Sequence, residues 1–191
     1  MDEKHRLRGD LRRRRSEFVA ALPDATRGLL FLRPPAPVVA LVPEGACVGL
    51  YHASGSEAPA LSYAKWFHEH GRTLALPWFA VRGSAMQFRV WRDPYAGAEL
   101  DEGPYGLLQP RANAREAAPQ AAFIPVIGFT AGCDRLGQGG GHYDRWLAAN
   151  PKAVAIGLAW DCQLTDVLPV EAHDKRLRAV VTPTRIYEEE G

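Results

Sequence analysis

The sequence has few cysteines, and none are spaced for a metal site. Its three cysteines, Cys47, Cys133 and Cys162, lie far apart, and the chain has no CxxC motif. A scattered, odd-numbered set is atypical of disulfide-stabilised secreted folds and of cysteine zinc sites. We therefore expect a cytoplasmic protein.

An excess of charge of one sign is also lacking. The chain carries 23 Lys and Arg against 22 Asp and Glu, a formal net charge of +1. General nucleic-acid and membrane-surface binders usually carry a strong basic excess, so neither partner is expected and any basic site must be local. No apolar run approaches the roughly 20 residues of a membrane span. The arginine-rich start lacks the apolar core of a signal peptide, and its interspersed acidic residues are atypical of a mitochondrial presequence.

What is present is the composition of a folded protein. Hydrophobic residues make up 47% of the 191 residues and charged residues 24%. That length and balance predict one domain over residues 1–191, and the absence of any linker or repeat agrees. We expect a monomer.

Short apolar runs alternate with helical patterns along most of the chain. Nearly continuous apolar runs of this kind are typical of strands covered on both faces. They occupy residues 46–51, 73–77, 121–125, 153–159 and 179–183. Helical spacing is found at residues 3–22, 61–71 and 143–151. This order predicts an α/β fold with a parallel sheet.

Three other segments carry weaker patterns. Residues 86–91 alternate in polarity and are interpreted as an exposed or antiparallel strand. Residues 33–45, rich in proline, are expected to be part loop and part short helix. Residues 92–110, rich in Gly and Pro, predict a long loop near the ligand side. The arginine run 12–15 matches no motif and is interpreted as surface charge.

The stretch "RLGQGGGHYDR", residues 135–145, concentrates glycine and charge. It lies between the strand that ends at Pro125 and a helix that begins near His142, an arrangement in which backbone N–H groups can collect phosphate oxygens. The pattern is neither a P-loop nor the dinucleotide fingerprint. From spacing alone, a phosphate-binding loop and a purely structural glycine turn both remain open.

The same stretch closely resembles the signature R-L-G-x-G-x-G-Y-Y-D of 5-formyltetrahydrofolate cyclo-ligases (methenyltetrahydrofolate synthetases). Further pieces follow in the family's order over almost the whole chain: "KHRLR" near the start, "YHASGSE" ending at Glu57, "ALPW" at a strand end and "LPVEAHD" ending at Asp174. The resemblance implies a three-layer α/β/α fold with a mainly parallel open sheet, Rossmann-like and NagB/RpiA/CoA-transferase-like.

The resemblance also implies an activity. Enzymes of this family close 5-formyltetrahydrofolate to 5,10-methenyltetrahydrofolate with ATP and Mg²⁺, releasing ADP and phosphate. A formamide is a poor electrophile, so in the family's mechanism its oxygen receives the γ-phosphoryl group before the neighbouring amine attacks. Such a reaction requires the enzyme mainly to position the reacting groups and to neutralise phosphate charge. The folate substrate could carry a polyglutamate tail.

Family roles transfer to particular residues. The implied ATP-binding set is Lys4, Arg8, Arg135, Leu136, Gly137, Gln138, Gly139, Gly140, Gly141, His142 and Tyr143. The implied catalytic set is Arg135, Tyr143 and Glu57. His52, Glu57 and Tyr105 are the implied folate contacts, with Trp78 as a second candidate aromatic wall. Asp144 and Asp174 are the implied Mg²⁺ ligands, because carboxylate oxygens suit this ion.

Each assignment has a structural alternative. Lys4 and Arg8 share one helical face that could simply be solvated, Tyr143 could be a core aromatic, and the two aspartates could be a helix-start carboxylate and a surface charge. Arg135 is expected to face the ligand and to contribute little to the core.

The chain departs from the family pattern at a few positions, which are Thr130, Cys133, Gly140, His142 and Arg178. Two of them replace acidic residues and favour a competing interpretation, a divergent relative that binds folate or nucleotide without turnover. A third possibility is nucleic-acid binding through the arginine-rich helix.

Overall fold

The computed structural model describes residues 3–189. Its helices are α1 (Glu3–Ala21), α2 (Asp24–Leu29), α3 (Ala36–Ala40), α4 (Leu61–Glu69) and α5 (His142–Ala149), with short 3₁₀ turns η1 (Gly97–Glu99) and η2 (Asp161–Gln163). Its strands are β1 (Cys47–Gly49), β2 (Thr73–Trp78), β3 (Gln87–Trp91), β4 (Leu100–Glu102), β5 (Leu108–Pro110), β6 (Glu116–Ala117), β7 (Ala121–Pro125), β8 (Gly128–Phe129), β9 (Arg135–Leu136), β10 (Val154–Leu158), β11 (Ala179–Val181) and β12 (Ile186–Glu188).

One eight-stranded sheet forms the centre, in the order β12-β11-β10-β7-β1-β2-β3-β6. Its five consecutive strands β11, β10, β7, β1 and β2 are parallel to one another. These are the five apolar runs of the sequence, so the prediction of a mainly parallel sheet is confirmed. The alternating segment at β3 pairs antiparallel with β2, as expected.

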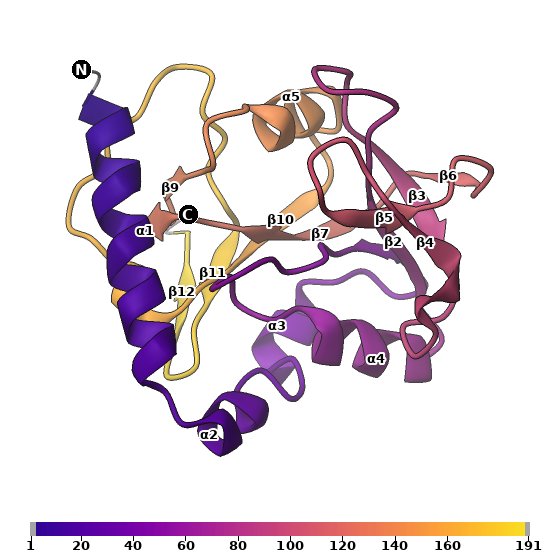
Figure 1. Ribbon diagram of the computed structural model, residues 1–191, viewed down its shortest axis with the longest axis horizontal. Coiled ribbons are helices and arrows are strands. Elements are labelled where there is room, and N and C mark those ends of the chain that lie inside the picture. The colour runs from indigo at the N-terminus through magenta and orange to yellow at the C-terminus, as the bar shows by residue number, and fades with distance from the viewer. Residues whose placement is uncertain (1–2, 190–191) are drawn as a thin grey trace.

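Helices cover both faces of this sheet. Figure 1 shows α5 on one side of the strands and α3 and α4 on the other. Successive residues of β7 enter opposite cores: Phe123 packs with the cluster that contains α4 residues, and Ile124 with the cluster that contains Trp146 of α5. Because both faces are covered, β7 can be continuously apolar. The three-layer α/β/α prediction is confirmed.

Residues 92–110 contain more regular structure than predicted. Strands β4 and β5 pair as an antiparallel hairpin in which Leu100 lies opposite Pro110. Its turn is closed by the Gly103 N–H, which donates to the Leu107 carbonyl at 2.8 Å, and Gly106 supplies a left-handed residue with φ +73°. The prediction of a plain loop was wrong because the two short strands lack an alternating apolar pattern and are held by backbone bonds. For residues 33–45, the predicted short helix is α3.

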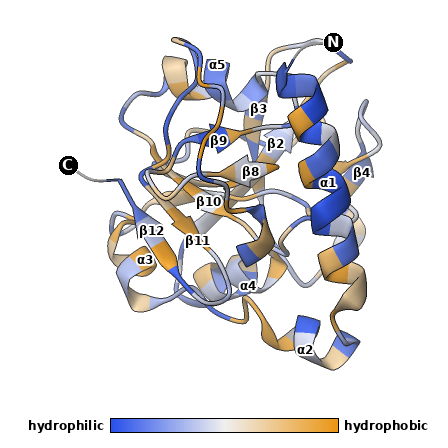
Figure 2. Cartoon of the chain, turned by 90° about the vertical axis from the view of Figure 1, so that its left-hand side faces the viewer, coloured by the Kyte–Doolittle hydropathy of each residue, from blue (hydrophilic) through white to orange (hydrophobic). Residues whose placement is uncertain are grey.

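Helix α1 packs more of its basic residues inward than the sequence suggested. In Figure 2 its hydrophilic stretches are interrupted by a few apolar positions. Arg15 is only 6% exposed, and its guanidinium donates to the Ser56 hydroxyl at 3.0 Å and to the Val126 carbonyl at 3.3 Å. The prediction that residues 12–15 are surface charge is therefore wrong for Arg15. Within residues 3–189, no helix combines the length and apolar character needed to cross a bilayer.

Gly49 of β1 packs closely against the side chains of Phe88 and Pro119. A Cβ atom there would lie 2.8 Å from the Phe88 ring and 3.2 Å from Pro119. Because Phe88 is buried in a packed core, we expect Gly49→Ala to lower the free energy of unfolding by about 1–3 kcal/mol. Chemical denaturation would measure this. Gly9→Ala in α1, where no atom lies within 4 Å, is the control and should raise stability slightly through helix propensity. Equal, neutral effects of both changes would contradict the packing argument.

Candidate active site

A cavity of about 600 Å³ opens at the carboxyl ends of the central strands. Tyr51, Pro77 and Pro125, which follow or end β1, β2 and β7, lie in its wall. Parallel strands end at the same edge of a sheet, so the loops that follow them meet there. The volume is within the range of small-molecule sites.

Except for Trp78, the residues that the sequence assigned to ATP, folate and Mg²⁺ line this cavity. They are Lys4, Arg8, His52, Glu57, Tyr105, Arg135, Leu136, Gly137, Gln138, Gly139, Gly140, Gly141, His142, Tyr143, Asp144 and Asp174. Trp78 is absent from the lining; its indole stacks under the Arg89 guanidinium at 3.6 Å. The folding therefore brings together segments that are up to 170 residues apart, as Lys4 and Asp174 are.

The glycine loop has its own conformational requirements. Gly139 and Gly141 have φ values of +106° and +61°, which side chains disfavour. A Cβ at Gly140 would lie 2.7 Å from the His142 ring. The Arg8 guanidinium donates to the Gly137 carbonyl at 2.9 Å. The glycines thus shape the turn and also keep its backbone open to the cavity.

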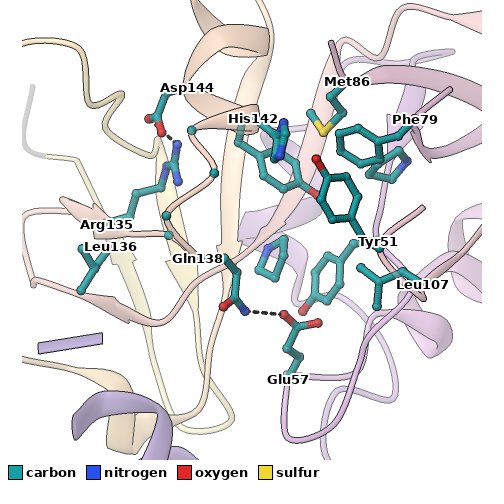
Figure 3. A pocket seen from close by; sticks show the side chains of 18 of the residues that line it. Tyr51, Glu57, Phe79, Met86, Leu107, Arg135, Leu136, Gln138, His142 and Asp144 are labelled. Carbon is teal, nitrogen blue, oxygen red and sulfur yellow. Dashed lines mark hydrogen bonds and ion pairs between the residues drawn. The ribbon is translucent and has the colours of Figure 1, made fainter. Parts of the chain in front are cut away.

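Arg135 and Asp144 form an ion pair at one end of the cavity (Figure 3), with a separation of 2.5 Å between Nη2 and Oδ1. The two side chains are only 3% and 16% exposed. The loop that contains Lys175 holds both, since its carbonyl accepts from Arg135 Nε at 3.2 Å and its N–H donates to Asp144 at 3.1 Å. Arg135 is therefore part of the packed structure, and the expectation that it contributes little to the core was wrong.

Lys4 and Asp174 form the second ion pair. The ammonium lies 2.8 Å from Asp174 Oδ2 and 2.9 Å from Glu171 Oε1. Burial alone would lower the pKa of Lys4, but the bonds to both carboxylates outweigh burial and raise it. Burial would likewise raise the pKa of Asp174, but the hydrogen bonds from Lys4 and the Glu171 N–H and the nearby positive charge together outweigh that effect and lower it. Asp174 is thus held as a carboxylate.

Asp144 and Asp174 by themselves do not make up a complete Mg²⁺ site. Within residues 3–189, no group of three or more His, Cys, Asp or Glu side chains is arranged to hold a metal. Asp144 and Asp174 each already face a cation. Since Mg²⁺ is usually held by one or two carboxylates together with phosphate oxygens and waters, the donor set fits an ion that arrives with a nucleotide.

The other end of the cavity is aromatic. The rings of Phe79, Tyr105 and His142 meet edge to face, with centroid separations of 4.8 to 5.5 Å. Figure 3 shows Met86 and Leu107 on the same side as Phe79, away from Arg135. Burial, followed by the neighbouring Arg145 charge, lowers the pKa of His142, which favours the neutral imidazole among the rings.

Several residues of this wall were missed by sequence reasoning. They are Tyr51, Pro77, Phe79, Met86, Gly103, Leu107, Leu108, Gln109 and Pro125, and beside the ion pairs Glu171 and His173. Phe79 had a detectable signal, because it directly follows the strand end "ALPW". Leu107 and Leu108 had only a general signal: residues 92–110 were predicted to lie near the ligand side, but which of them reach the cavity depends on the β4–β5 hairpin.

Most of the departures from the family signature lie away from the cavity. Arg178 is exposed and donates to the Glu189 carbonyl. Thr130 is buried, and its hydroxyl accepts from the Asp134 N–H at 3.2 Å. Cys133 is fully buried in a left-handed conformation with φ +66°, and burial raises its pKa to about 11. None of the three lines the cavity, whereas His142 and Gly140 do and pack against each other.

Comparison with known proteins places these features in one family. Residues 1–183 match the model of the 5-formyltetrahydrofolate cyclo-ligase family. A 5-formyltetrahydrofolate cyclo-ligase of Escherichia coli K12 is 40% identical over 97 residues, which are 48% of this chain and 53% of the relative. The alignment therefore spans about half the length of that relative. One from Mycolicibacterium smegmatis is 27% identical over 146 residues, 74% of this chain and 75% of the relative.

Solved structures show the same fold. The NMR structure of Aquifex aeolicus 5,10-methenyltetrahydrofolate synthetase superposes with a TM-score of 0.67 at 20% identity, covering 98% of this chain and 93% of that one. A 5,10-methenyltetrahydrofolate synthetase from Mycoplasma pneumoniae gives a TM-score of 0.67 at 18% identity, covering 99% and 100%. With the family match extending over nearly the whole sequence, the chain belongs to the 5-formyltetrahydrofolate cyclo-ligase family.

Proposed function

We propose that this protein is an enzyme that converts 5-formyltetrahydrofolate to 5,10-methenyltetrahydrofolate with ATP and Mg²⁺, releasing ADP and phosphate. The substrate could be polyglutamylated, and the enzyme would act as a cytoplasmic monomer. The observation that carries the proposal is the division of one cavity into an end lined by glycines and ion-paired charged residues and an aromatic end.

The glycine-lined end suits the phosphates of ATP. Lys4, Arg8 and Arg135 supply positive charge there, although carboxylates pair with the first and the third. Four of the five residues 137–141 are glycines and carry no side chain that would block approach. When bound, Mg²⁺ would supply further charge neutralisation, with Asp144 and Asp174 as its protein ligands. Arg135 is held by its bonds to Asp144 and Lys175, so its charge needs little rearrangement as phosphoryl transfer proceeds.

The aromatic end suits the flat rings of a folate. Phe79, Tyr105 and His142 offer ring edges and faces against which a pterin could pack. Glu57 lies away from Arg135 and Asp144 (Figure 3) and could accept hydrogen bonds from the ring nitrogens. Held this way, the formyl oxygen would point toward the phosphate end, and the attacking amine is already part of the same molecule.

The decisive experiment is a direct assay. Purified protein is incubated with 5-formyltetrahydrofolate, ATP and Mg²⁺, and the near-ultraviolet absorption of methenyltetrahydrofolate is followed. We expect the band to grow only when all three are present, with omission of ATP and chelation of Mg²⁺ as controls. Absence of the band at high protein concentration, with folate still bound, would favour the non-catalytic relative.

A further inference from the structure

The basic residues of α1 act as a row of donors to the loops around the cavity. Lys4, Arg8, Arg12 and Arg15 recur at spacings of four, four and three and so share one helical face. Lys4 bonds the loop at 171–174, Arg8 and Arg12 bond the glycine loop, and Arg15 bonds the loop at 51–57. Arg12 was expected to be surface charge, yet it belongs to this row.

Arg12 makes three contacts with a single glutamine. Its Nη2 lies 2.8 Å from Gln138 Oε1 and 3.1 Å from the Gln138 carbonyl oxygen, and its Nε lies 3.2 Å from Oε1. A guanidinium has donors only, so it must face the oxygen end of the amide. The amide NH₂ of Gln138 is thereby turned the other way.

The turned amide meets Glu57. Gln138 Nε2 donates to Glu57 Oε1 at 3.0 Å, a bond drawn in Figure 3. The second carboxylate oxygen, Oε2, accepts from the Ser54 N–H at 2.9 Å. With one bond on each oxygen, the carboxylate has a defined rotation.

The segment that carries Glu57 is also supported from the helix. The Arg15 guanidinium donates to the hydroxyl of Ser56, the residue before Glu57, and the indole N–H of Trp160 donates to the Ser56 carbonyl at 2.9 Å. The backbone is therefore anchored separately, and Arg12 and Gln138 act on the side chain.

We propose that Arg12 and Gln138 are positioning residues, a relay in which Arg12 orients the Gln138 amide and Gln138 holds the Glu57 carboxylate toward the folate. This rests on the proposed function, which makes Glu57 the folate ligand. It assigns a role to the variable position within the glycine signature and to an arginine outside the cavity.

Gln138→Glu provides the sharpest test. The substituted carboxylate still accepts from Arg12, but it cannot donate to Glu57 and places a like charge beside it. We expect the KM for 5-formyltetrahydrofolate to rise about tenfold, the scale for losing a hydrogen bond to a charged group. The relay predicts that this KM rises by a larger factor than the KM for ATP, because Gln138 acts on Glu57 and Glu57 is the proposed folate ligand.

Arg12 variants test the first link. Arg12→Gln should raise the same KM by roughly threefold to fivefold, because the amide of Gln138 can then turn over, and Arg12→Lys should recover part of the loss through one remaining donor. Arg13→Gln is the matched control, since Arg13 is exposed and pairs only with Asp10 on its own helix among the described contacts. The melting temperatures of the Gln138, Arg12 and Arg13 variants should equal that of wild type. A change in KM without a change in melting temperature indicates a positioning role and not a loss of stability.

The outcomes separate this inference from the proposed function. A KM for Gln138→Glu within twofold of wild type, or Arg12→Gln matching Arg13→Gln, would overturn the relay while the enzyme remains active. If wild type binds 5-formyltetrahydrofolate without turnover, dissociation constants from tryptophan fluorescence replace KM, and the same ranking supports the relay. If wild type does not bind folate, both proposals fail.

Discussion

Arg135→Lys is expected to lower turnover by about 10²-fold, the scale for removing one preorganised charge-stabilising donor. Lysine keeps the charge but loses the planar fork, so it cannot bond both Asp144 and the Lys175 carbonyl as Arg135 does. A steady-state assay with saturating ATP and folate would measure the effect. Because the arginine side chain is only 3% exposed, some loss of stability, about 1–2 kcal/mol, should accompany the loss of turnover.

A matched control is available for this substitution. Arg176 forms a similar pair with Asp134, at 2.9 Å, but lies outside the main cavity. Arg176→Lys should leave turnover unchanged. If Arg135→Lys instead unfolds part of the protein while the folded fraction turns over normally, the glycine stretch and its arginine are structural, and the catalytic role proposed for Arg135 is wrong.

Asp144→Asn is expected to raise the Mg²⁺ concentration needed for half-maximal activity by about 10–100-fold, the scale for impairing a metal site. The amide keeps the size of the side chain but loses the charge that the cation needs. Folate binding should change far less, because Glu57 and the aromatic rings lie at the other end of the cavity. Titrating Mg²⁺ at fixed ATP, and folate at saturating Mg²⁺, measures the two effects.

The structure adds a second consequence for this variant. Asp144 also neutralises the buried Arg135 guanidinium, and removing one partner of a buried pair is destabilising by up to about 3–5 kcal/mol. Thermal unfolding should therefore shift downward, unlike that of Asp134→Asn, whose partner Arg176 is half exposed. An Asp144→Asn protein that is less stable but has an unaltered Mg²⁺ titration would show that this carboxylate serves only Arg135.

Local patterns were enough to predict the parallel part of the sheet, whereas the edge strands β6 and β12 were not predicted. The five apolar runs form the five parallel strands. A strand covered on both faces needs apolar residues at nearly every position, and such a run can be recognised in the sequence without knowing the fold. The β4–β5 hairpin could not be predicted in the same way. Its residues alternate weakly, and its backbone pairing becomes favourable only where the hairpin lies against β2 and β3.

The residues of the candidate site were found in the sequence, but their pairing was not. The signature and its flanking motifs identified Lys4, Glu57, Arg135 and Asp174 one by one, because each motif is a short stretch whose resemblance to the family can be recognised without the fold. Arg135 is buried against Asp144, and Lys4 against Asp174. Both pairings depend on contacts between separate segments of the chain.

Helix α1 shows where local information ends. The sequence alone predicted a basic helix over residues 3–22, which the structure confirms as Glu3–Ala21, since spacing and composition are properties of the segment itself. Which arginines face solvent and which bind loops was decided only by the tertiary structure. Arg12, Arg13 and Arg15 are equivalent in sequence, yet folding places carbonyl, amide and hydroxyl acceptors beside the first and third and leaves the second exposed beside Asp10. A charged side chain is buried only where hydrogen-bond partners compensate for the loss of water. In this helix those partners come from other parts of the chain.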